Sequence, residues 1–169
     1  GFTDAVKDDS VIKYMYAFCL ELNGSIDDAE QIYAELDWKK DVNIACRYLI
    51  CKLSQAEYAK VINLYRDVDD SVINAKLKSL YLTALYYEEK ECYQKKLNEV
   101  LSEVADDLDD IVNIAFGVRK KTYLKDNVVP LIKKHMDTGL DKLALLQKIK
   151  LLVILSHADE LGLVGILLK

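Results

Sequence analysis

The residues best suited to acid–base chemistry are two histidines, and their surroundings argue against a catalytic role. His135 lies beside Met136 on the apolar stripe of a helical pattern, and His157 lies near the end of another helical segment. An enzyme needs acids, bases or nucleophiles positioned around such a group. Neither histidine has a Glu three residues before it, and the chain contains no glycine-rich phosphate-binding motif. The sequence therefore predicts a protein that is not an enzyme and has no cofactor.

The candidates for metal ligands are an acidic run and four cysteines. The run 106–110 lacks the central Gly and the terminal Glu of a calcium-binding loop, so we expect a connector that caps the next helix at Asp109 or Asp110. The cysteines have no C-x-x-C spacing and fall in apolar helical stretches. They are predicted to be small buried side chains in a reducing compartment, with no metal site: Cys19, Cys46, Cys51 and Cys92.

The elements that position these groups are predicted to be helices throughout. Only one Pro and six Gly occur in 169 residues, too few for an all-β chain. A short phrase recurs at the start of three helical runs, at 42–45, 72–75 and 112–115, and a period of this length is typical of stacked helix pairs. The prediction is one all-α domain, 1–169, an α-solenoid of four to five antiparallel helix hairpins near 10–36, 41–68, 71–104, 109–138 and 140–169.

Capping residues and apolar spacing also predict where single helices begin and end. We expect helices to begin at Ser10, at Asp41, at Ser54 and at Asp70 or Ser71, and the first of them to bury a stripe that includes Val11, Met15 and Leu22. The helix that begins at Asp109 or Asp110 is expected to continue to Leu124, and the next to have Pro130 in its first turn and to end at Thr138–Gly139. The run 143–155 is expected to be a helix buried on nearly every side, followed by a turn near Gly162.

Charge and hydropathy limit the kinds of partner. The net charge is −5, with an acidic excess in residues 1–110 and a basic excess in 111–169. An acidic first part argues against a nucleic-acid binder, whose affinity rests on neutralising phosphates. The most apolar run, 143–155, is interrupted by Gln147, Lys148 and Lys150, so no membrane span is expected. We predict a cytoplasmic protein that binds neither nucleic acid nor membrane.

The first hairpin resembles a tetratricopeptide repeat. Ala17 and Ala29 stand at the small positions of the two helices, Leu20 at a large apolar position, Gly24 at the turn and Tyr33 at the packing aromatic. Residues 41–68 follow the pattern more weakly, and the later hairpins depart from it in length. The resemblance implies a right-handed superhelix, and a HEAT-like or other array of helical hairpins is the alternative.

In the tetratricopeptide arrangement the first helix of each hairpin lines a concave groove. The resemblance therefore places eight residues on the inner face: Tyr14, Phe18, Asn43, Arg47, Asn74, Lys78, Asn113 and Lys120. Asn amides can hold the backbone of an extended peptide, and cations can hold carboxylates. We expect a non-catalytic scaffold that binds a protein, a peptide or another domain of the same chain. The alternative is a regulatory or sensor domain of a bacterial transcription factor or signalling ATPase.

The C-terminal segment is predicted to be a second contact surface. It is apolar and lacks the polar outer face of a terminal repeat, and the chain opens without Met, so a fragment of a longer protein is expected. Contiguous exposed apolar surface usually marks an interface. We expect six residues to be covered by self-association or by another chain segment: Leu161, Leu163, Val164, Ile166, Leu167 and Leu168.

Overall fold

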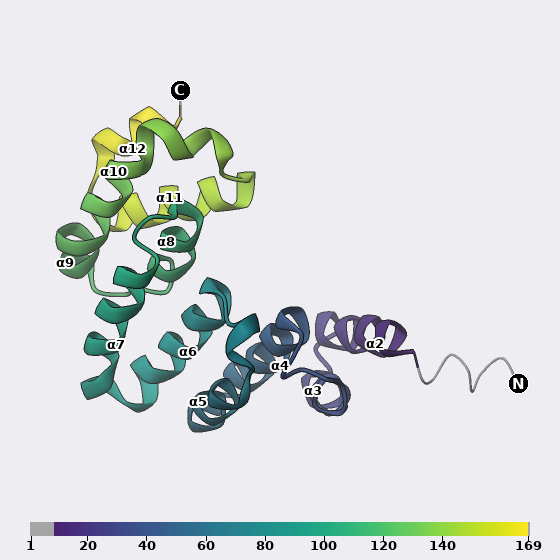
Figure 1. The fold of residues 1–169 in the computed structure, drawn as a ribbon. Helices are drawn as coiled ribbons and strands as arrows, with labels where there is room; N and C mark the ends of the chain where they lie inside the picture. The colour runs from purple at the N-terminus through teal and green to yellow at the C-terminus, as the bar shows by residue number, and fades with distance from the viewer. Residues whose placement is uncertain (1–8, 169) are drawn as a thin grey trace, which may run out of the picture. The chain divides into compact units, whose positions relative to one another are not determined.

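The computed structural model describes residues 9–168, and over this range the chain is all-helical, with helices packed in sequential pairs. The chain divides into two compact units, the first ending at Lys90 and the second beginning at Glu91 (Figure 1). Each unit has its own set of buried apolar side chains. The all-α class predicted from the sequence is confirmed for the described residues.

The first unit contains α2 (Ser10–Leu22), α3 (Ile26–Glu35), α4 (Val42–Ser54), α5 (Tyr58–Asp67), the 3₁₀ turn η1 (Asp70–Val72) and α6 (Ala75–Glu88). Each of these helices packs against the next one along the chain, as Figure 1 shows for the purple to teal segment. In addition, α4 packs against both α2 and α6. The helices that open consecutive hairpins therefore lie side by side.

The core between α2 and α3 is built on the residues that carry the repeat pattern. Ala17, Ala29 and Tyr33 are completely buried, and they form one cluster with Leu36 and Cys51. The two alanines have no side chain beyond Cβ, so the helices can approach closely around the Tyr33 ring. The turn between the helices uses Gly24 at φ +82°, a left-handed conformation that favours glycine.

Side-chain caps fix where the helices of this unit begin. Asp41 Oδ1 accepts the backbone N–H groups of Asn43 and Ile44 at 2.8 and 3.1 Å, which confirms the predicted cap of α4. The first cap is Asp9 rather than Ser10, because the Asp9 carboxylate accepts the Val11 N–H at 2.8 Å. Carboxylate oxygens satisfy N–H groups that have no partner within the helix.

Two predicted helix starts are wrong in this unit. Ser54 ends α4 instead of starting α5, because its hydroxyl donates to the Cys51 carbonyl at 2.7 Å. The predicted start at Asp70 or Ser71 is only the 3₁₀ turn, and α6 begins at Ala75. In both cases a surface residue with a hydroxyl or carboxylate side chain looks like a helix cap in the sequence, but it lies several residues before the true start of the helix.

Aromatic rings join several elements of the first unit. Tyr58 stacks on Tyr87 with ring centroids 4.7 Å apart, and Tyr65 stacks on Tyr81 at 4.3 Å, so both pairs connect α5 with α6. Trp38, in the connection after α3, is 8% exposed and meets the Tyr48 ring edge-on at 5.4 Å. Offset and edge-on aromatic pairs contribute about 1 kcal/mol each beyond their burial.

The second unit contains α7 (Lys90–Glu103), α8 (Leu108–Ala115), α9 (Lys121–Tyr123), the π turn η2 (Leu124–Val128), α10 (Val129–Gly139), the 3₁₀ turn η3 (Leu140–Lys142), α11 (Leu145–His157) and α12 (Leu161–Leu167). Pro130 lies in the first turn of α10, where a missing N–H has little cost, as predicted. The predicted end of this helix at Gly139 is also confirmed.

The centre of the second unit is α8, which packs against both α10 and α11. Its residues 111–115 are all buried. The prediction that this helix continues to Leu124 is wrong. The N–H groups of Gly117 and Val118 bond to the carbonyls of Ile114 and Ala115, and this tight turn closes the helix at Ala115.

The prediction that 143–155 forms a helix buried on nearly every side is also wrong. Leu151, Ile154 and Leu155 are buried, but Leu145 and Leu146 are 75% and 63% exposed. The chain then turns at Ala158–Glu160, with Asp159 at φ 59°, and not at Gly162, which lies inside α12. Only one face of α11 packs into the core, so the apolar residues on its other face remain at the surface.

The cysteines differ from one another in their surroundings. All four lie in the described range, and only Cys51 is buried, whereas Cys19 and Cys92 are exposed. Four buried cysteines were therefore a wrong prediction, because Cys19 lies on the outer side of α2. Burial raises the pKa of Cys51 to about 11, which keeps that thiol protonated at neutral pH. Among residues 9–168, no helix is both long and apolar enough to cross a membrane.

Candidate functional site

Four of the residues predicted to line the groove meet on neighbouring helices of the first unit. Tyr14 and Phe18 come from α2, and Asn43 and Arg47 come from α4. The Arg47 guanidinium lies 4.5 Å from the centroid of the Phe18 ring, a cation–π contact. We call these four residues the α2–α4 surface.

A partly buried carboxylate, that of Glu21, holds Arg47 in place. Glu21 Oε1 accepts from Arg47 Nη1 at 3.1 Å, and Glu21 Oε2 accepts from the Tyr33 hydroxyl at 3.1 Å. The Glu21 side chain is 12% exposed. Burial alone lowers the pKa of Arg47, but the Glu21 carboxylate and the Tyr14 hydroxyl raise it, and the net shift is upward. Arg47 therefore stays charged, in one orientation, at every physiological pH.

Beside this ion pair lies a hollow of about 210 Å³ between the start of α2 and the start of α4. It is lined by Ser10, Val11, Tyr14, Asp41, Asn43 and Ile44. The Tyr14 ring forms one wall and packs against Tyr33, with ring centroids 6.0 Å apart. Val11 and Ile44 are apolar, and the other four side chains carry hydroxyl, amide or carboxylate groups. This lining combines apolar contact with hydrogen-bonding groups, as ligand pockets usually do.

The second predicted pair of the first unit has a different role. Asn74 Oδ1 accepts the Leu77 N–H at 3.1 Å, so Asn74 is the N-cap of α6. Its side-chain oxygen is thus engaged by its own helix. Lys78 lies one turn further along α6 and is partly buried.

The remaining predicted pair, in the second unit, is separated. Asn113 is 6% exposed, and its amide connects two other residues: Nδ2 donates to Asp109 at 3.1 Å, and Oδ1 accepts from Lys150 Nζ at 2.9 Å. Lys120 is exposed and lies beyond the end of α8, as the N-cap of α9. The expectation that the two lie on one helix fails because α8 stops at Ala115. Asn113 is a core residue that fixes α8 to α11.

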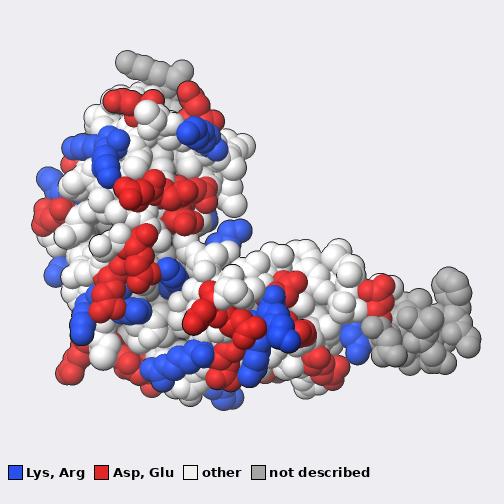
Figure 2. Space-filling view, in the orientation of Figure 1, with Lys and Arg blue, Asp and Glu red and all other residues white. Residues whose placement is uncertain are grey.

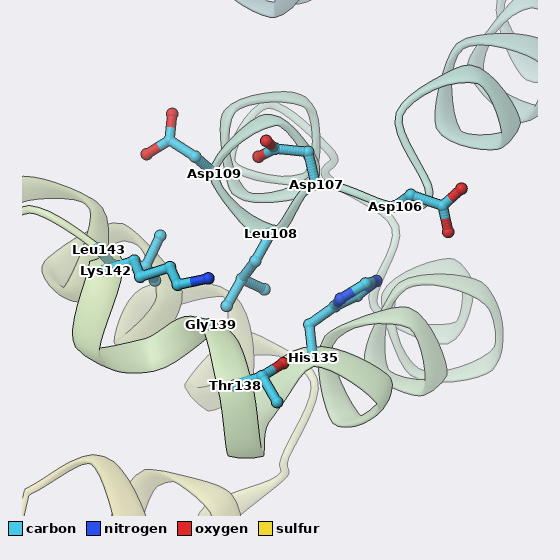
Figure 3. A pocket seen from close by; sticks show the side chains of 9 residues that line it. All are labelled: Asp106, Asp107, Leu108, Asp109, His135, Thr138, Gly139, Lys142 and Leu143. Atoms are coloured by element: carbon cyan, nitrogen blue, oxygen red, sulfur yellow. The ribbon is translucent and has the colours of Figure 1, made fainter.

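The second unit contains a hollow of about 270 Å³ between the start of α8 and the end of α10 (Figure 3). Its lining includes the acidic residues 106, 107 and 109 together with His135 and Lys142. In Figure 3 the three carboxylates point in different directions. No group of three or more metal-ligand side chains comes together anywhere in the described residues.

The titratable groups around this hollow have structural partners. Asp107 Oδ1 accepts the Asp110 N–H at 3.1 Å and caps α8. The acidic run does cap the helix, but the predicted cap at Asp109 or Asp110 is wrong, because both residues lie in the first turn of α8. Asp106 bonds to Lys134 at 3.0 Å, which lowers the pKa of that carboxyl. The His135 ring nitrogen Nε2 lies 2.8 Å from the Ala105 carbonyl. His135 thus connects α10 to the segment before α8, as expected of a packed histidine.

Sequence reasoning missed two exposed apolar faces. One is on α2, where Val11, Met15 and Leu22 are 65%, 51% and 70% exposed although the helical pattern predicted them to be buried. The helix instead turns Ala17 toward α3, because only a small residue allows close contact there. The other is on α11, where Ile149 and Val153 are about half exposed. The apolar surface on α12, where Ile166 is 55% exposed, was predicted. Both α2 and α11 are apolar on two sides, and periodicity alone does not say which side packs.

Charged side chains cover much of the remaining surface. On the face in Figure 2, acidic and basic residues are interspersed, with uncharged stretches between them. Many of them form ion pairs, such as Lys39 with Asp67 at 3.4 Å and Lys133 with Glu160 at 3.3 Å. Exposed pairs of this kind contribute little to stability.

The chain was compared with protein-family models, with curated proteins and with solved structures, and no match was found in any of the three comparisons.

Proposed function

We propose that the first unit is a tetratricopeptide-like array that binds an extended segment of a protein partner on its α2–α4 surface. One observation supports this most directly: Tyr14 and Asn43 line the same hollow, and Tyr14 also interacts with Arg47, whose guanidinium pairs with Glu21. The contacts of α4 with α2 and α6 are those expected when first helices of successive repeats stack.

The chemistry of the surface suits a peptide backbone flanked by one acidic and one apolar side chain. Asn43 is exposed and has both a donor and an acceptor, which match the C=O and N–H of an extended chain. Arg47 has five N–H donors, and the Phe18 ring and Glu21 hold its plane in one position. Fixing the guanidinium before binding reduces the entropy lost when a partner carboxylate bonds to it.

A displayed library of random linear peptides, selected on the chain and followed by calorimetry of the enriched sequences, tests the proposal. Asn43→Ala and Arg47→Ala should each weaken binding by about 5- to 100-fold, because a lost hydrogen bond in an interface costs about 1 to 3 kcal/mol. The matched controls are Asn63→Ala and Arg66→Ala, which remove the same side-chain types from exposed positions on α5. Circular dichroism should show unchanged helicity in all four variants.

Two results would reject the α2–α4 surface. One is an enriched peptide whose affinity falls as much with Asn63→Ala as with Asn43→Ala. The other is a set of enriched peptides that bind all four variants equally. If no sequence is enriched, the chain does not bind linear peptides and the proposal fails as well.

We further propose that the apolar face of α11 and α12 is a contact surface for a protein partner. Leu161 and Leu168 are 70% and 71% exposed, and Ile166 is 55% exposed. Self-association through this segment stays a prediction. Ile166→Asp and Leu161→Asp should increase solubility without lowering the melting temperature, since both side chains lie at the surface. Unchanged solubility in both variants would count against a contact role for this face.

A further inference from the structure

The outward face of α2 is unusual because it has no charge. The exposed residues in 10–22 are Ser10, Val11, Ile12, Met15, Tyr16, Cys19 and Leu22, and within this described helix neither charged residue, Lys13 or Glu21, is among them. The five large apolar side chains are between 42% and 70% exposed. A helix face in contact with water is normally polar or charged. This face is therefore expected to be covered.

The spacing along the face is that of a helix-pairing seam. Ile12, Met15, Cys19 and Leu22 follow one another at intervals of three, four and three residues. Apolar residues at this spacing keep a seam facing a second helix, as in coiled coils. Val11 and Tyr16 border the seam on its two sides. We call these six residues the α2 seam.

We propose that the α2 seam of one chain packs antiparallel against the α2 seam of a second copy. The two-fold axis crosses the helix pair at the height of residue 17, on the side of the helix opposite the buried Ala17 side chain. In this register Ile12 faces Leu22 of the second copy, and Met15 faces Cys19 of the second copy. This register pairs two branched side chains of the same size, Ile12 and Leu22, and sets the long Met15 against the small Cys19. The same contacts occur twice about the axis, as a two-fold interface requires. The antiparallel direction also sets the two helix dipoles in opposition.

Charge and area both favour a second copy over other occupants. Self-pairing of the α2 seam meets no charge repulsion, because none of its six residues is charged. The six side chains of the seam each bury on the order of 100 Å² of surface. Summed over both copies, the interface buries on the order of 1,000 Å². This is the lower limit for a specific interface.

The mass of the chain in solution tests the proposal, measured by light scattering and sedimentation over a range of concentrations. The wild-type chain should form a dimer. Met15→Asp and Ile12→Asp should each raise the dimer dissociation constant by at least about tenfold, because a carboxylate in an apolar seam loses its hydration. Helicity should stay unchanged, since both side chains are at the surface. Asn63→Asp, which adds the same charge at an exposed position on α5, is the control and should leave the dimer intact.

Disulfide trapping tests the direction of pairing. In a background with Cys19→Ser and Cys92→Ser, a mixture of Ile12→Cys and Leu22→Cys chains should form a covalent dimer on mild oxidation. Neither chain should do so alone. Trapping of each variant alone would show a parallel pair and overturn the antiparallel register.

Two further outcomes overturn the interface itself. A wild-type chain that is monomeric at all concentrations shows that no second copy covers the seam. A dimer that Ile149→Asp disrupts and Met15→Asp does not belongs to the α11 face. Val11 belongs to the seam and also lines the hollow beside Asn43, so the two surfaces share one residue. The peptide-binding test rests on Asn43 and Arg47, which lie outside the seam, so the two proposals can fail separately.

Discussion

The ammonium group of Lys52 lies 2.8 Å from the carboxylate of Glu57, and Glu30 approaches the same group from α3 at 2.5 Å. Lys52 is 6% exposed, so its charge depends on these two partners. Burial lowers the pKa of Lys52, but the hydrogen bonds that its ammonium group donates to both carboxylates outweigh this effect and raise the pKa overall. This triad connects α3, α4 and the start of α5.

Removing the lysine should destabilise the first unit. Lys52→Ala leaves two carboxylates facing each other without their cation, and we expect a loss of about 3 kcal/mol in the free energy of unfolding. Chemical denaturation measures it. Lys60→Ala, which removes the exposed partner of the same Glu57, should have little effect. Equal losses in the two variants would show that the triad has no special role.

The same triad predicts a dependence of stability on acid. The hydrogen bonds from Lys52 and then Lys60 lower the pKa of Glu57 below its ordinary value of 4.5. A lowered carboxyl pKa stabilises the fold above the ordinary value, and this contribution is lost as the pH falls through the lower folded-state pKa. The melting temperature should therefore decrease when the pH is lowered below about 4.5. This decrease should be smaller in the Glu57→Gln variant than in the control variant Glu99→Gln, which removes a carboxylate from an exposed ion pair with Lys96.

Enlarging the small residue between α2 and α3 should disturb the fold. Ala17 is completely buried, so Ala17→Leu should lower the free energy of unfolding by about 1 to 3 kcal/mol through overpacking. Ala34→Leu adds the same bulk at an exposed position on α3 and should leave thermal stability nearly unchanged. If both variants melt like the wild type, the inward orientation of Ala17 is wrong.

In the second unit, the buried amide of Asn113 should matter more for stability than for binding. Asn113→Ala leaves Lys150 and Asp109 without their shared partner, and we expect a loss of about 1 to 3 kcal/mol in the free energy of unfolding. Asn63→Ala, at an exposed position on α5, is the control. Any peptide affinity should be retained in Asn113→Ala at temperatures where the variant is folded. A weaker complex with unchanged stability would instead place Asn113 at a binding surface.

The sequence predicted those features that depend on local chemistry. Asp41 caps α4 because its carboxylate precedes two unpaired N–H groups, and Pro130 marks the first turn of α10 because its ring fits only there. These two inferences need only a few neighbouring residues. Tyr14, Phe18, Asn43 and Arg47 were placed on one face by the resemblance to the tetratricopeptide repeat.

Other features depend on contacts between distant residues and were beyond the sequence pattern. The position of Asn113 along its helix predicts an amide at the surface. In the structure α11 covers Asn113, and Lys150 donates a hydrogen bond to its side-chain oxygen. Likewise, α2 is apolar on both sides, and its orientation is decided by the fit of Ala17 against α3. A helical period identifies an apolar side, whereas packing between elements decides which of two such sides is buried.

The position of Trp38 gives the chain an internal optical reporter. It is the only tryptophan of the 169 residues, and it is buried against Tyr48 in the first unit. Its fluorescence therefore follows the unfolding of that unit, whereas far-ultraviolet ellipticity sums the helices of both units. Coincident denaturation midpoints from the two signals would mean that the units unfold as one cooperative block. Separate midpoints would give the stability of each unit from a single unlabelled sample.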